Sequence, residues 1–121
     1  MSFEQSDVDL LAAAEEIEIE TQPPGGSPRR TTIWVMVDEG DAFVRSVRGP
    51  EGRWYRDAIA NPAVAVIAAG RRLAATAIPA DDPDSVDRIN RALTAKYRGI
   101  PGYDEMLEPH VLEVNLRLEP A

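Results

Sequence analysis

The chain has 121 residues, of which 44% are hydrophobic and 28% charged, and it carries a net charge of −8 at pH 7. This length suits a single domain over residues 1–121, while the negative charge argues against nucleic acid and anionic membrane surfaces as partners. No apolar run approaches the roughly 20 residues of a membrane helix, the acidic N-terminus differs from a secretory signal, and cysteine is absent, so we expect a cytoplasmic protein.

The N-terminal segment predicts a short helix and a first strand. Ser6 and Asp9 resemble a capping box in front of apolar residues at helical spacing, which predicts a helix over 7–16. Apolar and polar residues then alternate over 17–22, a pattern typical of a strand with one solvent-facing side. The following PPGGSPRR cannot form regular structure and indicates a loop.

The central segment predicts a hairpin followed by a short helix. β-Branched and aromatic residues favour strands over 31–37 and 42–47, and the intervening DEGD places Gly40 where a tight turn needs positive φ. The sequence RGPEG then breaks the second strand. A helix is predicted over 53–61, where the dipeptide Asn-Pro stops it.

The C-terminal half predicts a second hairpin, a helix and a last strand. Strands over 63–69 and 73–79 flank a Gly-Arg-Arg turn, and Asp82 precedes a helix whose apolar residues share one face until Gly99. Strict alternation predicts a final strand over 110–118. Six strands joined mainly by hairpins favour a mainly β, antiparallel barrel with peripheral helices, because closure removes exposed strand edges.

Familiar catalytic and metal motifs are missing from this sequence. It contains no glycine-rich dinucleotide motif, no phosphate-binding P-loop and no serine–histidine–aspartate spacing. We interpret the single histidine, His110, as structural, and the acidic DDPD at 81–84 as a helix cap rather than a metal site. No metal site and no catalytic residue is therefore assigned.

Positive charge is concentrated in one region of the chain. Residues 29–72 contain eight arginines and five acidic residues, a net charge of +3 within a protein whose total is −8. The arginines surround glycines and two tryptophans, and arginine is suited to binding phosphate, while glycine lets backbone amides approach an anion. The alternative interpretation is a core tryptophan, a surface loop and solvated arginines, and residue types alone favour this alternative.

A resemblance to a known family changes the preference between these two interpretations. The stretches TTIWVMVDEGDAFVRSV (31–47), RWYRDAIANP (53–62) and AVAVIAAGRRLAATAIP (63–79) resemble, in order and spacing, the flavin-binding split-barrel superfamily of pyridoxamine-phosphate oxidases and deazaflavin-dependent nitroreductases. Val47 and Arg48 stand where deazaflavin reductases often have a glycine pair, and Ala58 and Ile59 replace the customary Asn-Leu.

The resemblance implies a six-stranded antiparallel split β-barrel that forms a homodimer, with FMN or a deazaflavin coenzyme bound at the subunit interface. Two groups of residues are implied at the cofactor. The isoalloxazine would be lined by Arg30, Thr32, Trp34, Arg45, Ser46 and Val47. The phosphate would be met by Arg48, Gly49, Arg53, Trp54, Tyr55 and Arg56.

Three functions remain open at this stage. The first is an FMN- or deazaflavin-dependent oxidoreductase acting on a small organic molecule, in which the cofactor supplies the redox chemistry. The second is a split-barrel module that binds a ligand or a partner without turnover, and the third is a structural dimer without cofactor. The sequence names neither the substrate nor the choice between the two cofactors.

Overall fold

The structure, a computed structural model, describes residues 3–121, and within this range it has seven strands and three α-helices. The strands and α-helices, in chain order, are α1 (Gln5–Ala13), β1 (Ile17–Thr21), β2 (Arg29–Ile33), β3 (Met36–Asp38), β4 (Asp41–Arg45), α2 (Arg53–Ala60), β5 (Ala63–Ala68), β6 (Arg71–Pro79), α3 (Pro83–Tyr97) and β7 (Asn115–Pro120). Short 3-10 helices are η1 (Gly49–Glu51), η2 (Asp104–Leu107) and η3 (Pro109–Val111).

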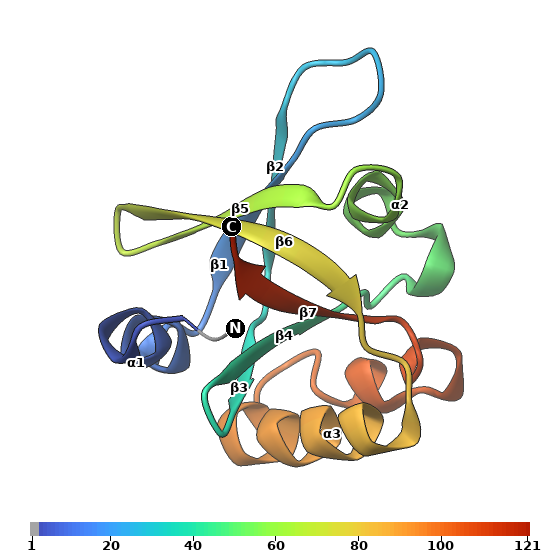
Figure 1. Cartoon of the computed structure of the whole chain (residues 1–121). Coiled ribbons are helices and arrows are strands. Elements are labelled where there is room, and N and C mark those ends of the chain that lie inside the picture. Colours follow the sequence, from blue (N-terminus) through green and yellow to red (C-terminus); the bar gives the residue numbers. More distant parts are fainter. Residues whose placement is uncertain (1–2) are drawn as a thin grey trace.

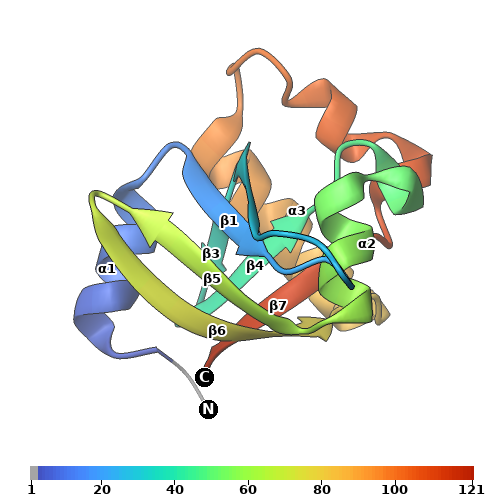
Figure 2. The same cartoon turned by 90° about the horizontal axis from the view of Figure 1, so that it is seen from above.

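All strand pairs are antiparallel, and the sheet order is β2-β1-β5-β6-β7-β4-β3. The two edge strands, β2 and β3, are consecutive in the chain and are separated by two residues, Trp34 and Val35. One chain segment therefore joins both edges, and the sheet curls into an open barrel with helices around it (Figures 1 and 2). The expected antiparallel split barrel is confirmed, with seven strands rather than six.

The additional strand arises because the predicted strand 31–37 is interrupted at Val35. The amide of Val35 donates to the Tyr97 hydroxyl at 3.2 Å, and its carbonyl accepts from the Lys96 ammonium at 2.9 Å. Both partners belong to the last turn of α3. The backbone polar groups of Val35 are thus satisfied by side chains instead of by a neighbouring strand, and the chain turns from β2 into β3.

Both predicted hairpins are confirmed. β3 and β4 pair from Asp38 opposite Asp41, and the two turn residues, Glu39 and Gly40, have φ of 48° and 85°. β5 and β6 meet at Ala69 and Gly70, with φ of 50° and 79°. The predicted Gly-Arg-Arg turn is wrong in its position, because Arg71 and Arg72 already pair with β5 as part of β6. Positive φ at two successive turn residues gives the twist that matches antiparallel strands.

Two apolar cores stabilise the domain. The barrel interior is filled by buried side chains from the strands and from the break at Val35, including Ile17, Ile19, Val35, Val44, Val66, Leu116 and Leu118. The second core lies between the sheet and α3, which runs beneath β3 and β4 in Figure 1. Ile89, Leu93 and Tyr97 of α3 pack there against Met36 and Phe43, and all five are fully buried.

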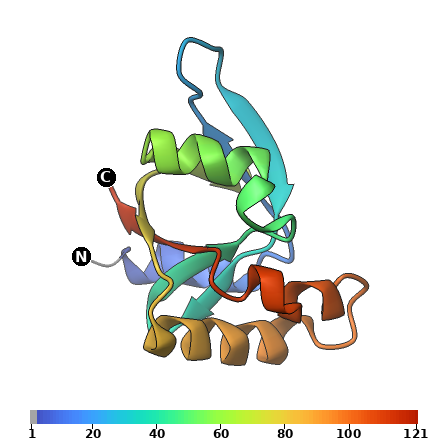
Figure 3. The same ribbon diagram turned by 90° about the vertical axis from the view of Figure 1, so that its right-hand side faces the viewer.

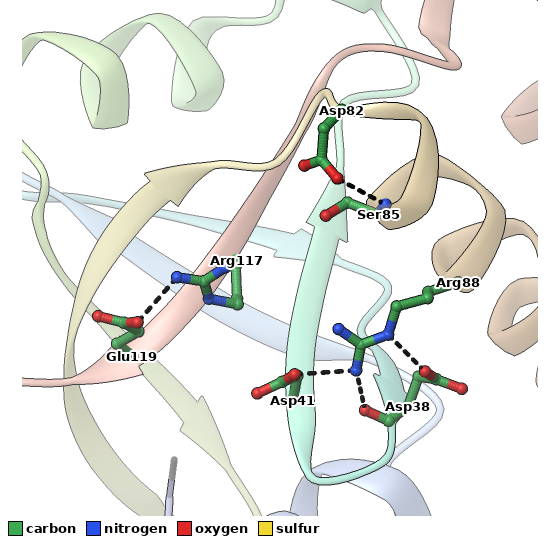
Figure 4. Close-up of polar contacts among 7 residues, drawn as sticks. All are labelled: Asp38, Asp41, Asp82, Ser85, Arg88, Arg117 and Glu119. Carbon is green, nitrogen blue, oxygen red and sulfur yellow. Dashed lines mark hydrogen bonds and ion pairs between the residues drawn. The ribbon is translucent and has the colours of Figure 1, made fainter. Parts of the chain in front are cut away.

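Polar contacts fix the start of α3 and its position against the sheet (Figure 4). The Asp82 carboxylate accepts from the Ser85 amide at 3.0 Å, so the predicted helix cap is confirmed. Further along the helix, Arg88 donates to Asp38 at 2.7 Å and to Asp41 at 2.8 Å, the two residues that flank the β3–β4 turn. Arg88 thereby holds this hairpin against α3.

Two predicted element boundaries are wrong. The first helix begins at Gln5 with Glu4 as N-cap, so Ser6 lies inside the helix and makes no cap. The predicted strand 110–118 begins only at Asn115, because Pro109–Val111 forms a 3-10 helix. Val111 and Val114 are both buried at a spacing of three, as in a helical turn. The alternation of apolar and polar residues before Asn115 therefore does not reflect a strand.

Candidate functional site

A cavity of about 680 Å³ opens beside the edge strand β2, a size typical of small-molecule sites. Five parts of the chain line it: the residue before β1, β2 and the residue after it, the end of β4 with the turn that follows, the first residues of α2, and the segment between α3 and β7. Figure 3 shows α2 and this last segment above and below on one side of the barrel. The lining residues are Glu16, Thr31, Thr32, Ile33, Trp34, Arg45, Ser46, Val47, Arg48, Gly52, Arg53, Trp54, Gly102 and Met106.

Trp34 provides a fixed aromatic surface in this cavity. Its ring stacks on Tyr97 with 4.1 Å between ring centroids and 2° between planes. Tyr97 is itself held because its hydroxyl donates to the Glu15 carbonyl at 2.6 Å. Burial raises the pKa of Tyr97 to about 12, with a smaller contribution from the nearby Glu15 and Glu16 carboxylates, so its phenol is neutral at physiological pH.

The turn between β4 and α2 is tightly packed. Ser46 Oγ donates to the Gly49 carbonyl at 2.8 Å, and the Gly52 amide donates to the same carbonyl at 3.2 Å. Gly49 has φ of 70°, a conformation that favours glycine. A Cβ at Gly52 would overlap Ser46 Oγ, so this second glycine is required by close approach. The glycines of this turn thus have a structural explanation in addition to any role in binding.

A buried carboxylate anchors α2 to the barrel. Asp57 accepts from Thr21 Oγ1 of β1 at 3.1 Å and from the Arg29 guanidinium of β2 at 3.0 Å. Asp57 lies one helical turn after Arg53. The start of α2, with its free backbone amides, is therefore held at a fixed position at the cavity.

Arg45 is the most unusual residue of the lining. It is 1% exposed, yet its guanidinium donates to neutral groups: the Asn115 and Asn90 side-chain oxygens at 2.7 and 2.8 Å, and the Met106 and Leu112 carbonyls. Burial lowers the pKa of Arg45 to about 10, so the group is charged at neutral pH. No carboxylate among residues 3–121 pairs with it, and a buried charge without a counter-charge is costly.

The eight arginines of residues 29–72 divide into three groups. Four form ion pairs with acidic side chains, namely Arg29, Arg30, Arg71 and Arg72. Arg45 is buried among neutral acceptors. Within residues 3–121, Arg48, Arg53 and Arg56 are exposed and have no ion pair or side-chain hydrogen bond. Arg48 and Arg53 line the cavity, so positive charge without a partner is concentrated there.

The structure brings together eight of the twelve residues predicted for the cofactor site: Thr32, Trp34, Arg45, Ser46, Val47, Arg48, Arg53 and Trp54. The other four do not line the cavity. Arg30 pairs with Glu20 on the outer surface, and Gly49 is buried against His110. Tyr55 packs beside Trp54, and Arg56 is exposed one turn further along α2.

Sequence reasoning missed several lining residues. Thr31 and Ile33 are direct neighbours of the predicted residues Thr32 and Trp34, and this adjacency is the signal that could have identified them. Gly102 and Met106 come from a segment interpreted only as a connecting loop, and a Cβ at Gly102 would lie 3.5 Å from the Trp34 ring. No local pattern marks this segment as part of a site, because it reaches β2 only through the packing of α3.

Comparison with known protein families identifies the family of this chain. A model of the family described as "Uncharacterized protein conserved in bacteria (DUF2255)" matches residues 7–118. The chain belongs to this family. No curated protein matches the chain. Within residues 3–121 of this DUF2255 protein, no helix is long and apolar enough to cross a membrane.

Solved structures share the fold at low sequence identity. A candidate pyridoxamine 5'-phosphate oxidase from Listeria innocua has a TM-score of 0.68 and 16% identity, covering 95% of this chain and 90% of that one. An F420-H2-dependent reductase, FDR-A, has a TM-score of 0.65 and 16% identity, covering 87% and 94%. HutZ, the heme storage protein from Vibrio cholerae, has a TM-score of 0.65 and 14% identity, covering 100% and 92%.

These similarities confirm the split-barrel fold implied by the sequence resemblance. The similar proteins differ in what their names say they bind or act on, and fold alone does not determine function. Which ligand this chain binds therefore depends on the residues that line its own cavity.

Proposed function

We propose that this protein binds a flavin-type cofactor, FMN or a deazaflavin coenzyme, in the cavity beside β2. The observation that supports this best is the charge of the lining. Within residues 3–121 it contains Arg45, Arg48 and Arg53, none of which pairs with a carboxylate, in a chain of net charge −8. An acidic protein that repels anions overall needs such a local reversal of charge to bind a phosphate.

The parts of the cavity suit the two ends of such a cofactor. The Arg48 and Arg53 guanidinium groups and the first amides of α2 are donors for a phosphate, and the buried charge of Arg45 gains a counter-charge when an anion binds. Trp34 and Trp54 offer apolar surface to a planar ring. When bound, the cofactor would supply hydride chemistry, while the protein binds and orients it.

The proposed reaction class is the reduction or oxidation of a small organic molecule by a homodimer. Titratable groups at the cavity are the guanidinium groups and Glu16, and Tyr97 lies behind Trp34 with its hydroxyl already hydrogen-bonded. The alternative is a protein of the same fold that binds a ligand without turnover. This alternative would be favoured if the absorbance spectrum of the bound cofactor does not change when a substrate or a reductant is added.

Arg53→Ala tests the cofactor site. A hydrogen bond to a charged group contributes roughly 1.5–3 kcal/mol, so losing the Arg53 contact should weaken FMN or deazaflavin binding by about ten- to a hundredfold. The measurement is a fluorescence titration of both cofactors at two salt concentrations, since a phosphate contact weakens with added salt.

Arg56→Ala is the matched control, because Arg56 is equally exposed on the same helix but outside the cavity lining. It should bind the cofactor nearly as tightly as the unmodified protein. Equal losses in both variants would indicate a general charge effect and contradict the placement at Arg53. If the unmodified protein binds neither cofactor, the proposal fails.

A further inference from the structure

The cavity carries charges of opposite sign on different walls. Arg45, Arg48 and Arg53 come from the segment that leads from β4 into α2. Glu16 comes from a different part of the chain, since it is the residue that precedes β1. Among the described residues 3–121, Glu16 has no ion pair or side-chain hydrogen bond, and its side chain is exposed to the cavity and to solvent.

The strand register places Glu16 at the Trp34 end of the cavity. Ile17, the next residue, pairs with Ile33 of β2, so Glu16 lies beside the position where β2 ends and Trp34 begins the break. Arg29, at the other end of β2, binds Asp57 of α2, which lies one helical turn after Arg53. With about 3.3 Å per strand residue, the stretch of β2 from residue 31 to Trp34 that lines the cavity is about 10 Å long.

We propose that Glu16 determines the ligand specificity of this cavity, and that the cavity selects aromatic molecules with an anionic group at one end and a cationic or N–H-donating nitrogen at the other. The anionic group binds at the arginines, the ring lies against Trp34, and the nitrogen meets the Glu16 carboxylate. A ligand of this kind satisfies both the arginines and Glu16, whereas a ligand with an anionic group at each end places negative charge against Glu16.

This inference rests on the proposed function in one respect, namely that the arginine wall binds phosphate. With a cofactor phosphate on that wall, Glu16 faces the ring end of the cofactor and the substrate beside it. Glu16 then favours substrates that carry a protonated amine or an N–H group and disfavours carboxylates. Glu16 is a specificity residue here; it holds a nitrogen in place and transfers no group.

The test uses three small probes that share a para-substituted benzene ring. O-Phosphotyramine has an aryl phosphate and an ammonium group, 4-ethylphenyl phosphate has the phosphate alone, and tyramine has the ammonium alone. Binding to the cofactor-free protein is measured by calorimetry near neutral pH and low salt. A partly solvated opposite charge is worth up to about 1 kcal/mol, so O-phosphotyramine should bind about fivefold more tightly than 4-ethylphenyl phosphate.

Glu16→Gln should abolish this preference without weakening 4-ethylphenyl phosphate. Glu15→Gln is the matched control, since Glu15 is the adjacent exposed carboxylate and does not line the cavity; the preference should persist in it. Equal affinities for the two phosphates in the unmodified protein, a preference that survives Glu16→Gln, or no binding of O-phosphotyramine up to about 10 mM would each overturn the inference.

The outcome for the cofactor is separable from the outcome for Glu16. FMN and the deazaflavin coenzyme could both fail to bind while the preference for O-phosphotyramine over 4-ethylphenyl phosphate exists and depends on Glu16. In that case the role of Glu16 stands and the proposed function fails. If a cofactor binds and the probe preference is unaffected by Glu16→Gln, the cofactor proposal stands and the role of Glu16 is wrong.

Discussion

Replacing Gly52 with alanine tests how tightly the turn in front of α2 is packed. The φ of Gly52 is −58°, so alanine meets no backbone strain, but its Cβ would overlap the Oγ of Ser46. This hydroxyl would have to move away from the Gly49 carbonyl, to which it donates a buried 2.8 Å hydrogen bond. A buried polar group that loses its partner costs about 1–3 kcal/mol, and Gly52→Ala should lower the free energy of unfolding by that amount.

A second substitution tests whether loss of the Ser46 hydrogen bond causes the destabilisation by Gly52→Ala. Ser46→Ala alone removes the same hydrogen bond and should cost about 1 kcal/mol. In the double variant the new Cβ would face the Cβ of residue 46 at 3.6 Å, an ordinary van der Waals contact. Adding Gly52→Ala to Ser46→Ala should therefore cost little, and the two effects should be non-additive by about 1 kcal/mol or more.

The assay is urea unfolding followed by tryptophan fluorescence, since Trp54 lies directly after this turn. A lower midpoint with an unchanged slope indicates a change in stability rather than in the unfolded state. In a thermal scan, about 1 kcal/mol corresponds to about 3–5 °C at this chain length. Equal losses for Gly52→Ala with and without Ser46 would refute the packing explanation.

Two further predictions concern Tyr97 and assembly. The pKa of Tyr97 is raised to about 12, so the folded state keeps a proton that the unfolded state loses above pH 10; this stabilisation is complete below pH 10 and should be lost as pH rises toward 12. Burial also raises the pKa of Tyr55, so a tyrosinate absorbance titration should show Tyr97 as the last ionisation, one that disappears in Tyr97→Phe; three similar ionisations in the unmodified protein would contradict it. We also predict a homodimer, because β2 is an edge strand beside the cavity and Val47 is a large apolar side chain 48% exposed at its rim. Sedimentation should give twice the 13.3 kDa chain mass at micromolar concentration, and a monomer would contradict the prediction.

Features that depend on neighbouring residues could be predicted from the sequence. Both hairpins could be predicted because Gly40 and Gly70 permit the positive φ that a two-residue turn needs. The start of α3 followed from Asp82 and Pro83, since a cap acts within one helical turn. The hairpin links already favoured an antiparallel barrel, the resemblance specified a split barrel, and the arginine-rich turn lies at the cavity.

Tertiary structure decided what depends on partners far along the chain. The break at Val35 is made by Lys96 and Tyr97, about sixty residues away, so no local pattern could reveal the seventh strand. The charge pattern of the sequence also did not show which arginines form ion pairs. In the structure, Arg30 pairs with Glu20 on the surface, whereas Arg45 is buried at the cavity without a counter-charge. The reason is that an ion pair depends on distance in space, and the barrel sets this distance by bringing distant strands together.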